Sequence, residues 1–313
     1  MLNKIYRISL SFLVLSSSIL FADDGNGGKA GAFQRVGIGA RAKALGGTFT
    51  GIADDNTAIF YNPSGIAFSE KKQITAYHNF MDVDRFQNFI AYSQKLPPTA
   101  AIGFAWLYSG TDNIDKRSST GQHLGFASAT NHEFIFSFAN RIGEKFALGI
   151  NVKYILETLP LRSSGTDQAR EGTIALDASM TFKPIENLTI GLLARDLKAD
   201  IGWKIDDYSR PASADGNIPI GVRAGASYKF SWVTLASDIE DYTSSDPIWH
   251  HGMEINYIEM IPLRVGLKDD VFTFGFGINY DLTEKVKVRF DYAYDDEDVG
   301  LRANQLFSVK LFF

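Results

Sequence analysis

The stretch FALGINVKYIL, residues 146–156, alternates apolar with polar or small side chains along most of its length. One face carries Phe146, Leu148, Ile150, Val152, Tyr154 and Leu156, and the other carries Ala147, Gly149, Asn151 and Lys153. Because successive side chains of a β-strand point to opposite faces, this alternation predicts a strand with one unbroken apolar face. The polar groups in the middle of the opposite face do not show whether that face contacts bulk water or an enclosed lumen.

Strands of the same kind recur along the chain. TIALDASMTFK (173–183), FTFGFGINYD (272–281) and VKVRFDYAY (286–294) have the same period of two, and residues 71–313 contain no long segment of helical period. Such a chain is predicted to be all-β, either a soluble sandwich or a closed transmembrane barrel. In a sandwich the polar faces meet water, whereas in a membrane barrel the apolar faces meet lipid and the polar faces line the lumen.

Strand counting favours an antiparallel transmembrane barrel of about 14 strands. The strands are expected to begin near residues 71, 85, 99, 132, 146, 171, 188, 217, 231, 248, 261, 272, 286 and 305. Short connections such as KLPPT and IGEK alternate with long ones such as SGTDNIDKRSSTGQHLGFASATN and KADIGWKIDDYSRPASADGN. An even number of strands, with short periplasmic turns and longer outer loops, is typical of bacterial barrels.

The two ends of the chain also favour the barrel. Residues 1–22 are interpreted as a signal peptide that is removed on export, because a basic start precedes the apolar run ISLSFLVLSSSILF. A membrane anchor is the weaker alternative, since a spanning helix needs about 20 apolar residues. At the other end, NQLFSVKLFF (304–313) alternates up to Phe313 and resembles the C-terminal signal of bacterial outer-membrane barrels. We therefore expect contact with the barrel assembly machinery through this strand, and location in outer-membrane lipid.

Composition argues against several classes of function. The chain has no cysteine, which excludes disulfides and thiolate metal sites. Its formal charge is −5, and no basic patch indicates nucleic-acid binding. His250 and His251 are adjacent on a strand, so they point to opposite faces and cannot chelate one ion together. No catalytic motif stands out, so we expect no cofactor, no metal and no enzyme, with an outer-membrane hydrolase as a weaker alternative.

Residues 23–70 lie outside the predicted strands, and VGIGARAKALGGTFTGIADDNTAIFYNPSG (36–65) is their central stretch. Its G-x-G-x-x-A spacing is that of a dinucleotide-binding turn, but nothing downstream has the strand–helix–strand pattern that such a site needs. A barrel of about 14 strands encloses a wide lumen. Because small residues let backbone approach backbone, residues 23–70 are predicted to form a plug, or hatch, of short helices and turns inside the barrel of residues 71–313.

The same stretch closely resembles the N-terminal signature of PorV/PorQ-like outer-membrane proteins, which belong to the wider FadL-like superfamily of barrels. The matching positions are Gly39, Arg41, Gly46, Gly47, Asp54, Asp55, Asn62, Pro63 and Gly65, with Ser64 where alanine is usual. The resemblance implies a hatch and passive passage of hydrophobic small molecules across the outer membrane. The alternative that it implies is an accessory barrel of a type IX protein secretion system, which holds or delivers cargo proteins.

Charged residues of the signature are candidates for a clamp on the hatch. We expect Arg41, Asp54 and Asp55 to pair with lumen residues such as Arg223, Lys287 or Arg289. The alternative is scattered, solvated charge in a wet lumen, where an ion pair contributes only about 0–1 kcal/mol.

Overall fold

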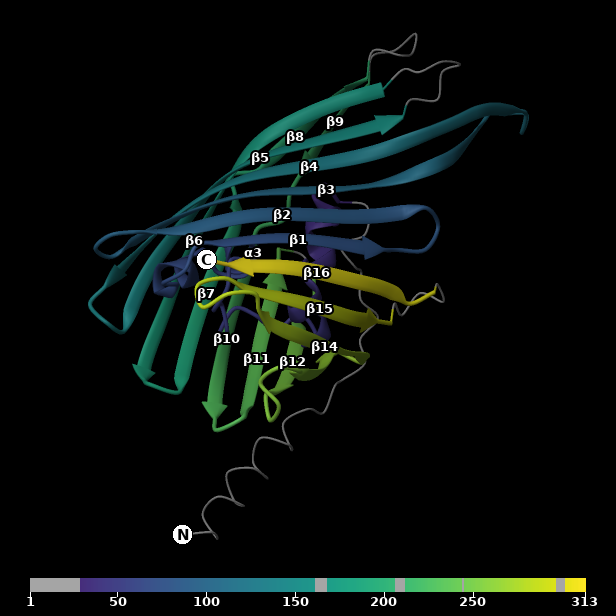
Figure 1. The fold of residues 1–313 in the computed structure, drawn as a ribbon. Helices are drawn as coiled ribbons and strands as arrows, with labels where there is room; N and C mark the ends of the chain where they lie inside the picture. Colours follow the sequence, from purple (N-terminus) through teal and green to yellow (C-terminus); the bar gives the residue numbers. More distant parts are fainter. Residues whose placement is uncertain (1–28, 161–167, 206–211, 244, 297–301) are drawn as a thin grey trace.

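The computed structural model describes residues 29–160, 168–205, 212–243, 245–296 and 302–313. Within these residues, 14 strands form one closed antiparallel barrel (Figure 1), which confirms the predicted fold class. They are β1 (Gln73–Phe80), β2 (Arg85–Leu96), β3 (Ala100–Arg117), β4 (His123–Ile142), β5 (Phe146–Pro160), β6 (Gln168–Ile185), β7 (Leu188–Leu197), β10 (Gly221–Phe230), β11 (Val233–Tyr242), β12 (Ile248–Ile255), β13 (Leu263–Lys268), β14 (Val271–Asp281), β15 (Lys287–Asp295) and β16 (Asn304–Phe312). The predicted signal peptide, residues 1–22, lies outside the described residues.

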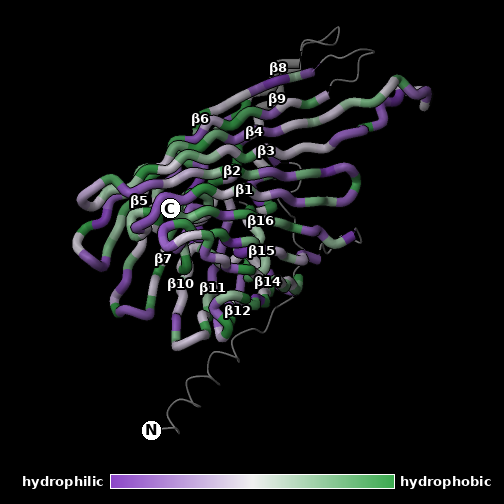
Figure 2. The backbone as a smooth tube through the Cα atoms, in the orientation of Figure 1, coloured by the Kyte–Doolittle hydropathy of each residue, from purple (hydrophilic) through white to green (hydrophobic). Residues whose placement is uncertain are grey.

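The apolar faces of the strands point out of the barrel and the polar faces point into it. On β5, Ile150 is 52% exposed, whereas the side chains of Asn151 and Lys153 are buried. Phe274 on β14 is likewise exposed beside the buried Thr273. Figure 2 shows the alternation of hydrophobic and hydrophilic residues along the strands. A soluble sandwich would bury its apolar faces between two sheets, so the observed arrangement is that of a membrane barrel.

The barrel closes between its first and last strands. β1 and β16 pair from Gln73 opposite Phe312 to Phe80 opposite Gln305. One residue further, the backbone groups of Phe313 and Lys72 exchange two hydrogen bonds of 3.0 Å. The barrel is therefore closed, and neither β1 nor β16 is an edge strand. The role of Phe313 as an assembly signal stays a prediction.

Two stretches that were expected to be loops are largely strands. Much of residues 109–131 continues β3 and β4 as a paired extension, with register shifts between Thr111 and Ile114 and between Lys116 and Arg117. Figure 1 shows this extension reaching beyond the ends of β1 and β2. The stretch 198–217 contains the hairpin of β8 (Asp200–Ile205) and β9 (Ala212–Asn217). The loop predictions were wrong because a hairpin that extends past the lipid needs no continuous apolar face.

Residues 29–72 precede β1, and we refer to them as the N-terminal segment. It contains the 3-10 helices η1 (Ala32–Val36) and η2 (Pro63–Phe68) and the short α-helices α2 (Ala40–Ala44) and α3 (Ala58–Tyr61). Gly46 and Gly47 follow α2 with positive φ angles, a conformation that favours glycine at the end of a helix. Among the described residues, no helix combines the length and apolar character needed to cross a membrane.

The backbone of the N-terminal segment lies directly against inward-facing glycines of the barrel. A Cβ on Gly266 of β13 would lie 1.9 Å from the amide nitrogen of Gly46. A Cβ on Gly191 of β7 would lie 2.1 Å from the carbonyl oxygen of Thr50. No side chain fits at such distances, so glycine is required at both wall positions. The small residues of the segment and the glycines of the wall together allow this close packing.

Candidate functional site

The inward-facing side chains of β1–β3 and of β10–β16 form two different walls. The uncharged wall comprises the buried side chains of β1–β3, and every residue of these three strands is among the described residues. Its members are Gln73, Thr75, Tyr77, Asn79, Gln87, Phe89, Ala91, Ser93, Ala101, Ala105, Leu107 and Ser109. The charged wall comprises the buried ionisable groups of β10–β16, chiefly Arg223, Asp238, Glu240, His250, Glu254, Arg264, Asp291, Asp295 and Lys310. Arg41, Lys43 and Asp55 of the N-terminal segment make ion pairs with strands of the charged wall.

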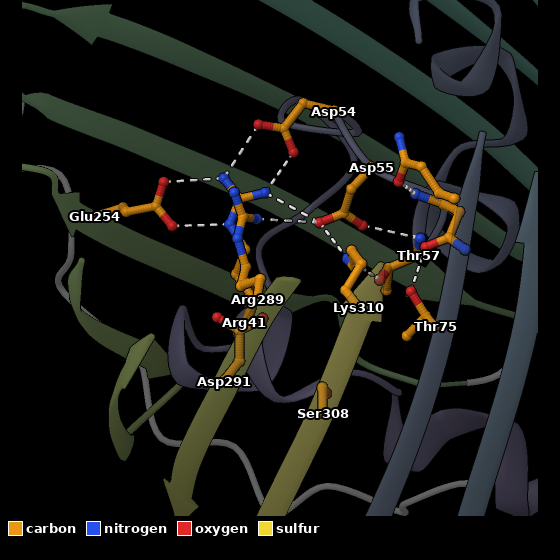
Figure 3. Close-up of polar contacts among 12 residues, drawn as sticks. Arg41, Asp54, Asp55, Thr57, Thr75, Glu254, Arg289, Asp291, Ser308 and Lys310 are labelled. Carbon is orange, nitrogen blue, oxygen red and sulfur yellow. Dashed lines mark hydrogen bonds and ion pairs between the residues drawn. The ribbon is translucent and has the colours of Figure 1, made fainter. Parts of the chain in front are cut away.

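Helix α2 places Arg41 against the charged wall, as Figure 3 shows. Its guanidinium donates two hydrogen bonds to the carboxylate of Glu254 on β12, from Nε at 2.8 Å and from Nη2 at 2.9 Å. Nη1 lies 3.2 Å from Oδ2 of Asp55, and the guanidinium also pairs with Asp54. A bidentate arginine–carboxylate contact fixes orientation as well as charge, so Arg41 sets the position of α2 relative to β12.

Asp55 receives the cations of the last two strands. Nζ of Lys310 on β16 lies 2.5 Å from its Oδ2, and Nη1 of Arg289 on β15 lies 3.8 Å from the same oxygen. The backbone N–H of Thr57 donates to Oδ1 at 2.9 Å. Burial alone would raise the pKa of Asp55, but the charges of Lys310, Arg41 and Arg289 lower it below its ordinary value. Asp55 is therefore ionised at neutral pH.

These contacts form one charge-balanced group, which we name the Arg41 cluster. Arg264 joins it by donating to Glu254 and to Asp291, each at 2.7 Å. The cluster contains four cations, Arg41, Arg264, Arg289 and Lys310, and four carboxylates, Asp54, Asp55, Glu254 and Asp291. The side chain of Asp54 is 54% exposed, whereas that of Asp55 is 2% exposed. Solvated charge therefore describes Asp54 but not the rest of the cluster.

A second set of contacts binds the turn that follows α2. Nη2 of Arg223 on β10 donates to the carbonyl oxygen of Gly47 at 2.5 Å. Oδ2 of Asp238 on β11 accepts hydrogen bonds from the backbone N–H groups of Phe49 and Thr50, at 3.0 and 2.9 Å. These backbone groups lie outside any helix, so the barrel side chains satisfy groups that would otherwise be buried without partners.

Of the three predicted lumen partners, only Arg289 pairs with one of the predicted clamp residues. Arg289 reaches Asp55, whereas Arg223 pairs with Asp238 and Glu240 instead. Among the described residues, Lys287 makes no ion pair. The reason is its register, because Lys287 stands opposite Phe312 while Arg289 stands opposite Lys310, at the level of Asp55.

The other residues of the signature shape the segment itself. Nδ2 of Asn62 donates to the carbonyl oxygen of Thr50 at 2.8 Å and to Oγ1 of Thr181 on β6 at 2.9 Å, rather than capping η2. A Cβ on Gly65 would lie 2.3 Å from the carbonyl oxygen of Ala53. Gly39 precedes α2 with a φ of 80°, and Pro63 is the first residue of η2.

Sequence reasoning missed several barrel residues that bind the N-terminal segment. Glu254, Lys310 and Asp238 were not singled out, although each occupies an inward position on an alternating strand. A charged residue in the middle of an inward face was the available signal. It gives the side on which the charge lies but not its partner, because partners come from strands that are far apart in the sequence.

The structure agrees with the interpretation of the adjacent histidines. His250 faces the lumen, where Nδ1 lies 2.7 Å from the carbonyl oxygen of Gly46. His251 lies on the other face, with Nδ1 3.0 Å from Oγ of Ser237. Within the described part of the chain, no three acidic or histidine side chains gather as ligands for a metal ion.

Several solved outer-membrane transporters share the fold. The toluene transporter TbuX of Ralstonia pickettii superposes with a TM-score of 0.66 at 14% identity, over 88% of this chain and 98% of that one. The toluene transporter TodX of Pseudomonas putida gives 0.61 at 14% identity, over 88% and 97%. A FadL homologue of Pseudomonas aeruginosa gives 0.64 at 12% identity, over the same shares. These neighbours are transporters and related barrels rather than enzymes, and at such identities they show the fold alone.

At the level of sequence, no curated protein matches the chain. The model of one protein family, described as type IX secretion system protein PorV, matches residues 27–240. That match covers most of the chain, including the N-terminal segment and the strands through β10. Together with the closed barrel and its outward apolar face, it places the protein in the bacterial outer membrane. The chain belongs to the PorV family.

Proposed function

We propose that the N-terminal segment is a plug that keeps the lumen closed, and that the barrel is an accessory protein of protein secretion across the outer membrane. The observation that carries this proposal is the buried, charge-balanced Arg41 cluster. Removing one partner from a buried ion pair costs about 3–5 kcal/mol. A solute that crossed the lumen on the side of the charged wall would have to separate several such pairs, whereas an accessory barrel can keep all of them.

The family match supports the same proposal. The matching model is described as a type IX secretion system protein, and its range includes Arg41, Asp54 and Asp55 of the plug. In this role the partners are other secretion-system proteins, or the cargo proteins that they export. No catalytic motif in the sequence favours an enzymatic role.

A second candidate is the passive passage of hydrophobic small molecules. It is favoured by the uncharged wall, where Phe89 and Leu107 offer an apolar surface without an ion pair to break. The fold similarity to the toluene transporters is consistent with this role. A hydrophobic molecule that crossed the barrel in this way would pass along β1–β3, and the plug would have to move away from the uncharged wall.

Deletion of the gene in the native bacterium separates the two candidates. Proteins in the medium, at the cell surface and in the periplasm are quantified by mass spectrometry, and uptake of radiolabelled toluene and oleate is measured in the same cells. We expect exported cargo to accumulate in the periplasm while uptake stays unchanged. Complementation with the wild-type chain, which should restore secretion, is the control.

The opposite pattern would refute the secretion role. If export is unaffected and uptake of either hydrophobic compound falls, the barrel is a transporter. Co-purification from outer membranes provides an independent comparison, since secretion-system subunits are expected with an accessory barrel and bound lipid or hydrocarbon with a transporter.

A further inference from the structure

A second group of buried charges lies on β4–β7, between the uncharged wall and the charged wall. It consists of Glu133 on β4, Lys153 on β5, Asp177 on β6 and Asp196 on β7, and we name it the Lys153 cluster. Each of these residues is at most 4% exposed. Nζ of Lys153 lies 2.7 Å from Oδ1 of Asp177 and 3.6 Å from Oε1 of Glu133, and it also pairs with Asp196. One ammonium group thus faces three carboxyl groups, whereas the charges of the Arg41 cluster balance.

Two of the three carboxyl groups receive the hydrogen bonds of the cluster. Asp177 accepts from Nδ2 of Asn151 at 2.8 Å and from the backbone N–H of Asp196 at 2.9 Å, in addition to its ion pair. Asp196 accepts from Nζ of Lys153 and, at 3.5 Å, from Nε2 of Gln34. Hydrogen bonds to the charged form of a carboxyl group favour that form, so both aspartates are ionised.

Glu133 receives none of these hydrogen bonds. Its Oε2 is buried and has no hydrogen-bond partner among the described residues, and the distance of 3.6 Å from Oε1 to Nζ of Lys153 is too long for a hydrogen bond. The residues directly opposite on β3 and β5 are Leu107 and Ile155, and both are fully buried. A carboxyl group without donors in such surroundings is far less costly when it is neutral than when it is ionised.

The other charged groups near the cluster leave the same imbalance. The next cation is Arg195 on β7, whose Nη2 donates to the carbonyl oxygen of Phe60 at 2.9 Å. Arg35 of η1 and Glu157 of β5 add one charge of each sign. Even when Arg195 is counted, two cations face the three carboxyl groups of the cluster, and one bound proton balances them.

We propose that Glu133 is a proton-binding site of the lumen, which holds one proton at neutral pH and releases it at alkaline pH. The inference goes beyond the role proposed in secretion and does not depend on it. An ionisable side chain that is buried within the membrane-spanning part of a protein, without a partner that explains it, is itself a reason to expect a function.

The proton is expected to affect the N-terminal segment, because the cluster contacts the segment at two places. Nδ2 of Asn151, which donates to Asp177, also donates to the carbonyl oxygen of Ile59 at 2.9 Å. Gln34 of η1 donates to Asp196. Once Glu133 is ionised, three carboxylates share Lys153 and repel one another, so the contacts of β4–β7 with the segment weaken.

The proton also gives the stability of the barrel a defined dependence on pH. In the unfolded chain Glu133 is ionised at neutral pH, whereas the folded barrel keeps it neutral. Because the folded state then binds one proton more than the unfolded state, stability falls as the pH rises, until Glu133 is ionised in the folded barrel as well.

The test uses the full mature barrel in a detergent that has no carbonyl group. Infrared spectroscopy at neutral pH detects the C=O stretching band of a protonated carboxylic acid, which is recognised by its shift in heavy water. We expect this band in the wild-type barrel and its loss at alkaline pH. Glu133→Gln, which keeps the size and the neutrality of the side chain, should remove the band at neutral pH.

Glu254→Gln is the matched control. Glu254 is also buried, but it accepts hydrogen bonds from Arg41 and Arg264 and is ionised, so this variant should leave the band unchanged. Heat-modifiable gel mobility establishes that each variant is folded.

Thermal unfolding and proteolysis over a series of pH values test the consequence. The Tm of the wild-type barrel should equal that of Glu133→Gln at acidic pH and should fall progressively below it as the pH is raised. Proteolysis within residues 29–72 should increase with pH in the wild-type barrel and less in the variant.

Three results would overturn the proposal. The absence of a carboxylic-acid band from the wild-type barrel at neutral pH decides against the proton site even if a variant fails to fold. A band that Glu133→Gln leaves unchanged would assign the proton to another residue. An equal dependence of proteolysis on pH in the wild-type barrel and in Glu133→Gln would remove the link to the N-terminal segment. None of these results bears on secretion, which the deletion experiment measures separately.

Discussion

The uncharged and charged walls contact the same segment in different ways. On the uncharged wall, α3 brings Ile59 so close to β3 that a Cβ on Gly103 would lie 2.6 Å from its Cδ1. Such apolar contacts depend on area and shape but only weakly on direction. On the charged wall, Arg41, Asp55 and the backbone after α2 make directed contacts with single side chains. The uncharged wall also makes directed contacts, because the backbone N–H of Asn56 donates to Oε1 of Gln73 at 2.8 Å and Nε2 of Gln87 donates to the carbonyl oxygen of Phe33 at 3.1 Å. The two walls therefore differ in charge: the charged wall holds the segment through buried ion pairs, whereas the uncharged wall holds it through apolar packing and neutral hydrogen bonds.

The largest effect is expected on the charged wall, from Arg41→Ala. The variant leaves Glu254 and Asp55 without their guanidinium partner, and removing one member of a buried ion pair costs about 3–5 kcal/mol. We expect channel openings in planar bilayers to become at least about a hundredfold more frequent, because each 1.4 kcal/mol corresponds to about a factor of ten. Proteolysis within residues 29–72 should increase in parallel.

Arg41→Lys is the matched control for this variant. It retains the charge but loses the two parallel hydrogen bonds to Glu254, so its effect should be intermediate. If Arg41→Ala has wild-type conductance and wild-type protease resistance, the charged wall does not hold the segment.

The next effect is expected from Gly266→Ala, which tests the shape of the charged wall without changing its charge. The added methyl group would lie 1.9 Å from the backbone nitrogen of Gly46 and 2.2 Å from the carbonyl carbon of Leu45. Because backbone atoms cannot swing away as a side chain does, we expect a cost of about 1–3 kcal/mol. Partial protease access to the segment, with the heat-modifiable barrel band retained, is the predicted result. An unchanged digestion pattern would mean that the segment lies further from β13.

A smaller effect is expected on the uncharged wall from Ile59→Val. The change removes one methylene-sized group next to Gly103 and should cost about 0.5–1.5 kcal/mol. Thermal stability should fall slightly while channel conductance stays at the wild-type level, since no directed contact is lost. An increase in conductance as large as that of Arg41→Ala would remove the distinction between the two walls.

The smallest effect is expected from Asp54→Asn. Asp54 pairs with Arg41 but is 54% exposed, and exposed ion pairs contribute only about 0–1 kcal/mol. Asp55→Asn, one residue further, breaks buried contacts with Lys310 and Arg41 and should behave like Arg41→Ala. Equal effects of Asp54→Asn and Asp55→Asn on conductance would show that burial does not separate the two carboxylates.

The sequence carried most of the information about the barrel wall. The alternation in residues 146–156 gave the faces of β5, and strand counting gave the barrel. Both depend on local periodicity, which a single strand displays. The extension of β3 and β4 escaped prediction because residues such as Asp112, Asn113 and Asp115 have the composition of a loop.

The site was less predictable than the wall. Arg41 and Asp55 were identified from the signature, but Glu254 is 213 positions from Arg41, and Lys310 is 255 from Asp55. Arg289 reaches Asp55 whereas Lys287, two residues earlier on β15, does not, and this difference depends on how β15 and β16 pair. Such partners follow from the register and closure of the whole barrel, which no local pattern specifies.

Disulfide trapping tests most directly whether the N-terminal segment lies inside a barrel with an outward apolar face. The chain contains no cysteine, so an introduced pair is unambiguous. The backbone N–H of Ala40 donates to Oγ of the inward-facing Ser308 at 2.8 Å, whereas Val309, the next residue, is exposed on the outer face. We predict that Ala40→Cys with Ser308→Cys forms a disulfide in intact outer membranes and that Ala40→Cys with Val309→Cys does not. A cross-link to position 309, or none to position 308 in the folded barrel, would contradict this placement.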